Sequence, residues 1–212
     1  MILRRLLFDQ SASSAAEFAM VLPMLMILMF GIIDAGRWMW TYNEAEKATQ
    51  MGARMAVVAD GVAGDPGSGK GIYSSYLGVS NLIQGDVIPA SAFGKITCTG
   101  SGSGASITAT CTCTTSPCPT LGTANKTAFA NIVTRMQFFL PQLTASNVTI
   151  EYSSSGLGYA GSPILPDLSP LVTAKITGLT FTPLTLFALK SMPMPNFTTT
   201  LSAEDLSGQY SN

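Results

Sequence analysis

The most strongly patterned part of the chain is an unbroken apolar segment close to its N-terminus. Residues 18–33 carry no charged or strongly polar side chain, and extension to residues 15–35 adds only Glu17 and Asp34, near the two ends. The extended segment is about 21 residues, or roughly 31 Å as a helix, which matches the hydrocarbon core of a bilayer. The pattern therefore predicts a transmembrane helix.

Two other interpretations of this segment compete with a retained membrane anchor. A buried core helix of a soluble protein is disfavoured because the run is apolar on every face. A cleaved secretory signal fits the basic start at Arg4 and Arg5. However, the apolar run is longer than a typical signal core, and charges with Trp38 and Trp40 follow it instead of a small-residue cleavage site. We expect the anchor to be retained.

The orientation of the anchor follows from the cysteines and not from the basic residues. Trp38, Trp40 and Tyr42 suit the headgroup region at the C-terminal end of the span. Basic residues stand on both sides of the span, so the positive-inside count does not decide. All four cysteines follow the span, in a Ser/Thr/Gly-rich stretch typical of exported domains. We expect the N-terminus in the cytoplasm and the remainder outside.

The helix is expected to continue beyond the membrane. Apolar residues at spacings of three and four form an amphipathic stripe in residues 41–58: Ala45, Ala48, Met51, Met55 and Val58. Glycines and Pro66 end the pattern. One helix over residues 15–59 would be about 65 Å long. We expect a leader at 1–12, a transmembrane helix at 13–40, an amphipathic extension at 41–60 and an extracytoplasmic domain at 61–212.

The remainder of the chain predicts a mixed domain. Thr-rich runs flank a Gly/Ser loop and indicate a hairpin over residues 95–113. Thr123 is a candidate cap for a helix over residues 124–140, which Pro141 ends. Further strands are expected at residues 148–152, 171–181 and 197–201. The expected fold class is α+β, with the long N-terminal helix followed by a C-terminal domain built on an antiparallel sheet.

Composition removes several classes of function. The formal net charge is −1, so a basic surface for nucleic acid is not expected. The chain has no histidine, the commonest general base and metal ligand, and no recognisable nucleophile motif. Residues 156–161 match a dinucleotide fingerprint in letters only, because prolines at 163, 166 and 170 prevent the helix that the motif requires. We predict a loop there, a non-enzymatic protein and no cofactor.

The four cysteines predict two disulfides. Cys98, Cys111, Cys113 and Cys118 allow three connectivities. Residues two apart in a strand point the same way, so a Cys111–Cys113 bond is disfavoured. We expect Cys98 to bond one of these two across the hairpin and Cys118 to bond the other. A zinc site would need paired CxxC spacing, which is missing, so no metal is predicted.

The N-terminal quarter resembles a known family. Within residues 12–58 the chain carries Glu17-Phe18, Leu22-Pro23, Gly31-Ile-Ile-Asp34 followed by Gly36-Arg37, and Gly52-Ala53-Arg54. These motifs resemble the TadE-like family of prepilin-type proteins from tight-adherence (Flp-type) pilus systems. The runs GLGYAG, VTAKITGLTFTPL and LSAEDL in the C-terminal half give a softer match. The resemblance implies a minor pilin or pseudopilin, since the major pilins of these systems are far shorter.

The resemblance also implies a processing site. In the family, a glutamate five residues into the mature chain pairs with the newly exposed N-terminal amine. Counting back from Glu17 places that amine on Ser13 and the cleaved bond between Ala12 and Ser13. The pairing would offset the burial cost of both charges and set the stagger between subunits. The family usually has glycine before the cut, and this chain has Ala12 instead.

Other residues of the span have physical roles that follow from their type. Pro23 removes a backbone hydrogen bond and is expected to kink the helix. Gly31 and Ala35 lie four apart and either form a close-approach face for a partner helix or face lipid. Asp34 and Arg37 lie one turn apart and can pair at the membrane edge.

The implied partners are a prepilin peptidase, the pilus assembly platform and other pilins, together with the lipid bilayer. The implied location is the inner (cytoplasmic) membrane, as a single-pass protein, and the pilus after assembly. The alternative is a standalone single-pass membrane protein whose extracytoplasmic domain binds a ligand. That alternative needs neither Glu17 nor processing.

Overall fold

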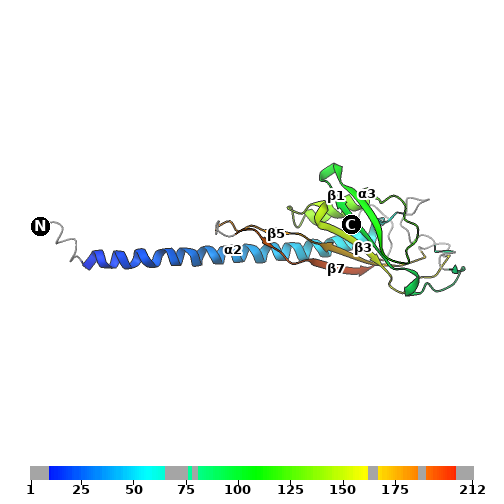
Figure 1. The fold of residues 1–212 in the computed structure, drawn as a ribbon, viewed down its shortest axis with the longest axis horizontal. Coiled ribbons are helices and arrows are strands. Elements are labelled where there is room, and N and C mark those ends of the chain that lie inside the picture. Colours follow the sequence, from blue (N-terminus) through cyan, green and yellow to red (C-terminus); the bar gives the residue numbers. More distant parts are fainter. Residues whose placement is uncertain (1–9, 65–75, 78–80, 162–166, 186–189, 204–212) are drawn as a thin grey trace. The chain divides into compact units, whose positions relative to one another are not determined.

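The structure of the chain, a computed structural model, describes residues 10–64, 76–77, 81–161, 167–185 and 190–203. The chain divides into two compact units. The helix–hairpin unit comprises Met1–Tyr42 and Thr180–Pro193, and the sheet unit comprises Asn43–Leu179 and Met194–Asn212. Helix α2 (Gln10–Val58) contributes its first part to one unit and its second part to the other (Figure 1).

Helix α2 confirms the long N-terminal helix that the sequence predicts. It has 49 residues, and its assignment is unbroken at Pro23. The helix ends where the sequence expects it to, with the Ala59 N–H donating to the Met55 carbonyl before the chain turns at Gly61. Methionine, leucine and alanine dominate its first half, and all three favour helix.

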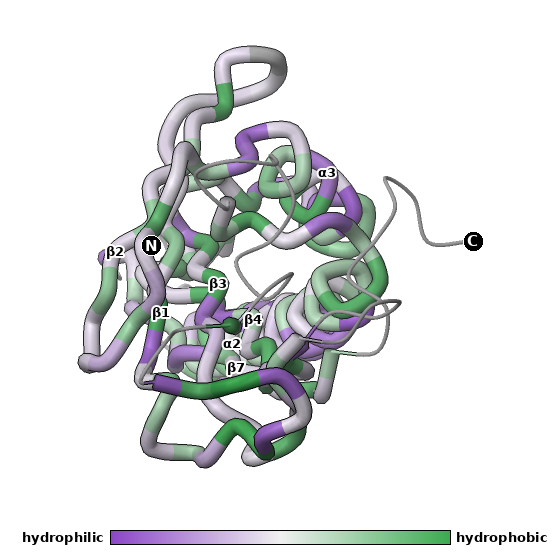
Figure 2. The backbone as a smooth tube through the Cα atoms, turned by 90° about the vertical axis from the view of Figure 1, so that its right-hand side faces the viewer, coloured by the Kyte–Doolittle hydropathy of each residue, from purple (hydrophilic) through white to green (hydrophobic). Residues whose placement is uncertain are grey.

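The sheet unit contains a five-stranded antiparallel sheet with the order β2-β1-β3-β4-β7. Its strands are β1 (Lys95–Ser101), β2 (Thr108–Thr115), β3 (Val148–Ser153), β4 (Leu171–Ile176) and β7 (Phe197–Ser202). Buried and half-buried residues alternate along β3 and β4, as expected for strands with one face in a core. Figure 2 shows hydrophobic and hydrophilic segments of the backbone interspersed around these strands. The α+β class is therefore confirmed.

Helix α3 (Lys126–Gln137) covers the core face of this unit. Its buried stripe comprises Ala128, Phe129, Ile132, Val133 and Met136. The predicted cap was wrong: Asn125, and not Thr123, caps the helix, because its side-chain oxygen accepts from the Ala128 N–H at 3.1 Å. Gly100 of β1 lets α3 approach closely, since a Cβ there would lie 2.0 Å from the Phe129 ring.

The second part of α2 packs into the same core. Ala45, Ala48 and Met55 of the predicted stripe are buried, while Met51 and Val58 are half-buried. The buried Thr49 hydroxyl donates to the Ala45 carbonyl at 2.7 Å, so this polar group is satisfied within the helix. Short 3₁₀ helices η2 (Ala90–Ala92), η3 (Gly104–Ser106) and η4 (Ala145–Asn147) connect the elements.

The strand predicted over residues 171–181 is divided in the structure. β4 ends at Ile176, and Gly178 adopts a left-handed conformation with φ +70°. The amide of Asn147 donates to the Thr177 carbonyl at 2.9 Å and holds this break. β5 (Thr180–Phe181) then pairs with β6 (Met192–Pro193) in a separate two-stranded sheet. This β5–β6 hairpin is part of the helix–hairpin unit.

Candidate functional site

The first part of α2 exposes apolar side chains all around its axis. Every described side chain from Ser14 to Met29 is exposed. Twelve large apolar residues in this stretch and just after it are among them: Phe18, Met20, Val21, Leu22, Met24, Leu25, Met26, Ile27, Leu28, Met29, Ile32 and Ile33. An apolar surface of this extent marks a membrane or protein contact and not a surface in water. By length and composition the helix can cross a membrane.

Glu17 is an exposed charged residue in this apolar stretch, one turn from its beginning. Ala12 and Ser13 also lie in α2, but their side chains are outside the description. Cleavage at the predicted site, the bond between Ala12 and Ser13, would make Glu17 the fifth residue of the processed chain. No other described element covers the Glu17 carboxylate. Processing and the register role of Glu17 stay predictions.

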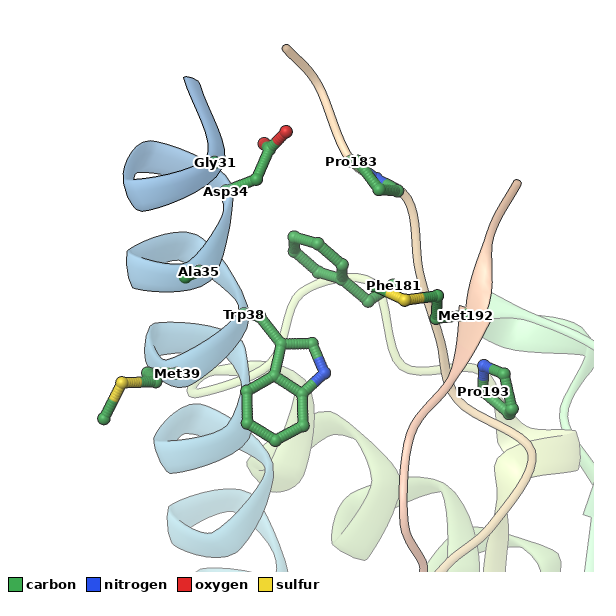
Figure 3. A pocket seen from close by; sticks show the side chains of 9 residues that line it. All are labelled: Gly31, Asp34, Ala35, Trp38, Met39, Phe181, Pro183, Met192 and Pro193. Carbon is green, nitrogen blue, oxygen red and sulfur yellow. The ribbon is translucent and has the colours of Figure 1, made fainter. Parts of the chain in front are cut away.

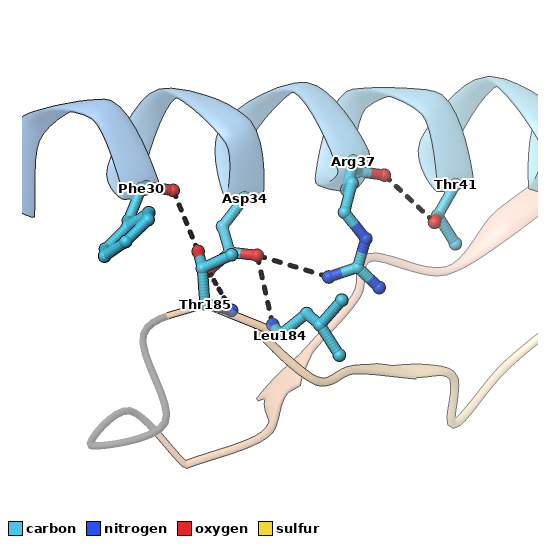
Figure 4. A network of polar contacts seen from close by, with 6 residues as sticks. All are labelled: Phe30, Asp34, Arg37, Thr41, Leu184 and Thr185. Atoms are coloured by element: carbon cyan, nitrogen blue, oxygen red, sulfur yellow. Dashed lines mark hydrogen bonds and ion pairs between the residues drawn. The ribbon is translucent and has the colours of Figure 1, made fainter. Parts of the chain in front are cut away.

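Asp34 is the centre of a polar network between α2 and the β5–β6 hairpin (Figure 4). Asp34 is only 5% exposed. Oδ1 accepts from the Leu184 N–H at 3.0 Å, and Oδ2 accepts from the Thr185 N–H at 3.1 Å. The Thr185 hydroxyl lies 2.6 Å from Oδ2 and 3.0 Å from the Phe30 carbonyl oxygen. The carboxylate thus holds two successive backbone donors of a segment 150 residues away.

Arg37 completes the network on the side of α2. Its guanidinium Nη1 lies 3.2 Å from Asp34 Oδ1, an ion pair between residues one turn apart. The same guanidinium lies 5.4 Å from the centroid of the Phe181 ring, within the range of a cation–π contact. The Thr41 hydroxyl donates to the Arg37 carbonyl at 3.0 Å. Arg37 therefore links the carboxylate to the first strand of the hairpin.

A groove of about 600 Å³ lies beside this network (Figure 3). Asp34 is its one ionisable lining residue, and the others are apolar or glycine: Gly31, Ala35, Trp38, Met39, Phe181, Pro183, Met192 and Pro193. A Cβ built on Gly31 would meet nothing within 4 Å, so the helix surface there is open. The lining suits an apolar occupant such as a helix or an acyl chain.

One comparison with known protein families covers the α2 residues of this network. Residues 12–54 match the family model of TadE-like proteins. The predicted resemblance is confirmed over that stretch, which contains Glu17, Asp34 and Arg37. No curated protein and no solved structure matches the chain. The hairpin that binds Asp34 lies outside the TadE-like match, so its partnership with the helix is visible only in the structure.

The two expected disulfides are present in the sheet unit. Cys98 of β1 bonds Cys111 of β2, directly opposite in the strand register, with a Cα–Cα distance of 4.0 Å. Cys113 bonds Cys118, five residues later, with a Cα–Cα distance of 6.0 Å. Cys98 is fully buried, so the first bond ties the hairpin to the core.

Residues 156–161 begin no helix. They form turns and isolated bridges, with the Tyr159 N–H donating to the Asp167 carbonyl. The buried Asp167 side chain, which the sequence analysis did not single out, accepts from the Gly161 N–H at 2.8 Å and the Tyr76 N–H at 2.5 Å. Among the described residues, no group of three or more acidic or cysteine side chains could hold a metal ion.

Proposed function

We propose that this chain is a membrane-anchored minor pilin or pseudopilin that takes part in assembly of a tight-adherence (Flp-type) pilus. The observation that carries the proposal is the coincidence of two features in residues 12–54. This stretch matches the TadE-like family, and the apolar residues of its first part, from Ser14 to Met29, are exposed all around one helix. Such a helix is stable in lipid or among similar helices, but not in water.

The mechanism is a transfer of this helix from lipid to a fibre. Side chains such as Leu25 and Leu28 keep an apolar environment in both states, so the transfer needs no large desolvation. Gly31 and Ala35 permit close approach of a neighbouring helix, and the open surface at Gly31 supports this role. Glu17 would pair with the Ser13 amine of an adjacent subunit and set the register.

The disulfides support an orientation with the sheet unit outside the cytoplasm. Both bonds lie after the span, and disulfides persist in oxidising compartments. The protein would reside in the inner membrane with its N-terminus in the cytoplasm until assembly. Its partners would be a prepilin peptidase, the assembly platform and other pilins, and its role would be structural and not enzymatic.

The decisive experiment is the intact mass of the membrane-extracted protein, from cells with and without the prepilin peptidase. We expect a peptidase-dependent start at Ser13. A chain that begins at Met1 in both strains would overturn the pilin proposal and favour the standalone membrane protein with a ligand-binding domain. Ala12→Gly restores the usual residue before the cut and should increase the processed fraction, which makes it the matched positive variant.

The register role of Glu17 is tested separately from processing. Glu17→Gln keeps the size of the side chain and removes its charge. We expect this variant to be processed but depleted from the sheared pilus fraction. Glu46→Gln, at an exposed position of the same helix outside the apolar segment, is the control and should assemble normally.

A further inference from the structure

We propose that residues 181–185 of the β5–β6 hairpin are a second membrane contact, inserted into the lipid of the leaflet at the C-terminal end of the span. The occupant of this surface is the acyl region of the bilayer. This inference rests on the proposed membrane anchor and adds a lipid-binding surface to it. It assigns a role to residues 181–185, which lie outside the stretch matched by the family.

The first argument is the depth of the hairpin along α2. The Thr185 hydroxyl reaches the carbonyl of Phe30 at 3.0 Å. Phe30 precedes Asp34 by four residues, or about 6 Å along the helix, and lies within the apolar run of residues 18–33. If that run spans the hydrocarbon core, Thr185 must lie at hydrocarbon depth beside it. Trp38, one turn beyond Asp34, then lies at the headgroup level.

The second argument is the surface that the hairpin presents. Leu184 is 63% exposed, and Ile32 and Ile33, which directly precede its partner Asp34 on the helix, are also exposed. Lys190 is exposed, and a lysine there can extend its ammonium group to lipid phosphates.

The third argument is the pairing of backbone N–H groups in the hairpin. A loop in hydrocarbon must have its N–H groups paired, because no water is present to accept from them. The N–H groups of Leu184 and Thr185 both donate to the Asp34 carboxylate. Pro183 and Pro193 have no N–H at all.

The same contacts explain why a carboxylate is tolerated at this depth. A charge near the hydrocarbon edge is costly unless it is paired and hydrogen-bonded. Asp34 has the guanidinium of Arg37, two backbone donors and one hydroxyl. The hairpin therefore supplies hydrogen-bond donors to the Asp34 carboxylate, and the carboxylate supplies acceptors to the backbone N–H groups of the hairpin. Residues 181–185 carry no charged side chain for recognition of a protein partner, which favours lipid over a second polypeptide.

The test is spin-label accessibility in the full-length protein, reconstituted into phosphatidylcholine–phosphatidylglycerol vesicles. All four native cysteines are in disulfides, so an added cysteine is labelled selectively. The test position is Leu184→Cys. Ile32→Cys, exposed on the span, reports lipid, and Leu157→Cys, exposed in the sheet unit, reports water. Oxygen concentrates in lipid and a nickel chelate in water, so their collision ratio reports depth.

We expect the collision ratio at Leu184→Cys to equal that at Ile32→Cys and to exceed that at Leu157→Cys several-fold. A ratio equal to that at Leu157→Cys, with Ile32→Cys still in lipid, would overturn the hairpin insertion and leave the anchor intact. If the spectrum at Leu184→Cys is broadened in fully labelled protein and sharpens when unlabelled protein is added, two labels lie close together. That result would assign residues 181–185 to a contact with a second copy instead. If Ile32→Cys itself reports water, the anchor fails and the insertion fails with it.

Discussion

The two halves of α2 are continuous in the backbone but meet different environments. In residues 14–33 apolar side chains cover every face, and all of them except the half-buried Phe30 are exposed. In residues 43–58 they form one stripe, rich in alanine and buried against the sheet unit. Protein packing buries the apolar side chains of the second half, whereas those of the first half still need an apolar partner. The same helix therefore carries a fold determinant in one half and an interaction surface in the other.

The largest expected difference between the halves is in folding stability. Met55→Ala removes a side chain that is 5% exposed and should lower the free energy of unfolding of the sheet unit by about 2–5 kcal/mol. Met24→Ala removes the same side chain where it is 77% exposed and should leave that free energy unchanged. Urea denaturation in detergent, followed by circular dichroism, measures both. Equal losses for the two variants would mean that the first half is also part of the folded core.

For membrane insertion, we expect substitutions in the first half of α2 to have the larger effect and substitutions in the second half to have none. Ile27→Arg places a cation in the middle of the apolar run and should make insertion less favourable by about 2.5–3.5 kcal/mol. Gln50→Arg places the same cation at an exposed position of the second half and should have no effect. The apparent insertion free energy in microsomes measures the difference. Identical insertion of both variants would argue against a membrane role for residues 14–33.

The network at Asp34 is where the first half acquires a protein partner. Asp34→Leu removes the acceptor of two half-buried backbone donors, and each donor left unpaired costs about 1–3 kcal/mol. We expect hydrogen exchange at Leu184 and Thr185 to accelerate by roughly 5- to 150-fold. Thr41→Val, which removes only the hydroxyl bond to the Arg37 carbonyl, is the control. Unchanged exchange in Asp34→Leu would show that apolar packing alone holds the hairpin.

Much of the helix could be predicted because its signals are local. The apolar run and the stripe beginning at Ala45 are read from spacings of a few residues. The ion pair of Asp34 with Arg37 was also visible as a one-turn spacing. The contact between the hairpin and Asp34 could not be predicted in this way. Its donors are the backbone N–H groups of residues 184 and 185, and every non-proline residue has such a group, so no residue type marks the contact.

Boundaries within the sheet unit were harder to predict for a related reason. Thr123 and Asn125 are both good helix caps, and the choice of Asn125 depends on where the first turn of α3 meets its neighbours. The strand expected over residues 171–181 has a continuous β-type pattern, but Gly178 breaks it with a left-handed backbone. The amide of Asn147, distant in sequence, fixes that break.

The smallest effect expected is a dependence of stability on alkaline pH where the second half of α2 ends. Just after the helix, the Val62 N–H donates to the hydroxyl of Tyr152, which is fully buried in β3. Burial raises the pKa of Tyr152 above its usual value, and the bond from Val62 offsets this only in part. The folded state therefore keeps the phenol proton at a pH where the unfolded chain has lost it, so stability is full below about pH 10 and falls as the pH rises further. Tyr152→Phe should flatten this fall while costing about 1 kcal/mol at neutral pH for the lost acceptor. Tyr159→Phe, at an exposed tyrosine, should leave the pH profile unchanged, and the same slope in all three proteins would exclude Tyr152 as its origin.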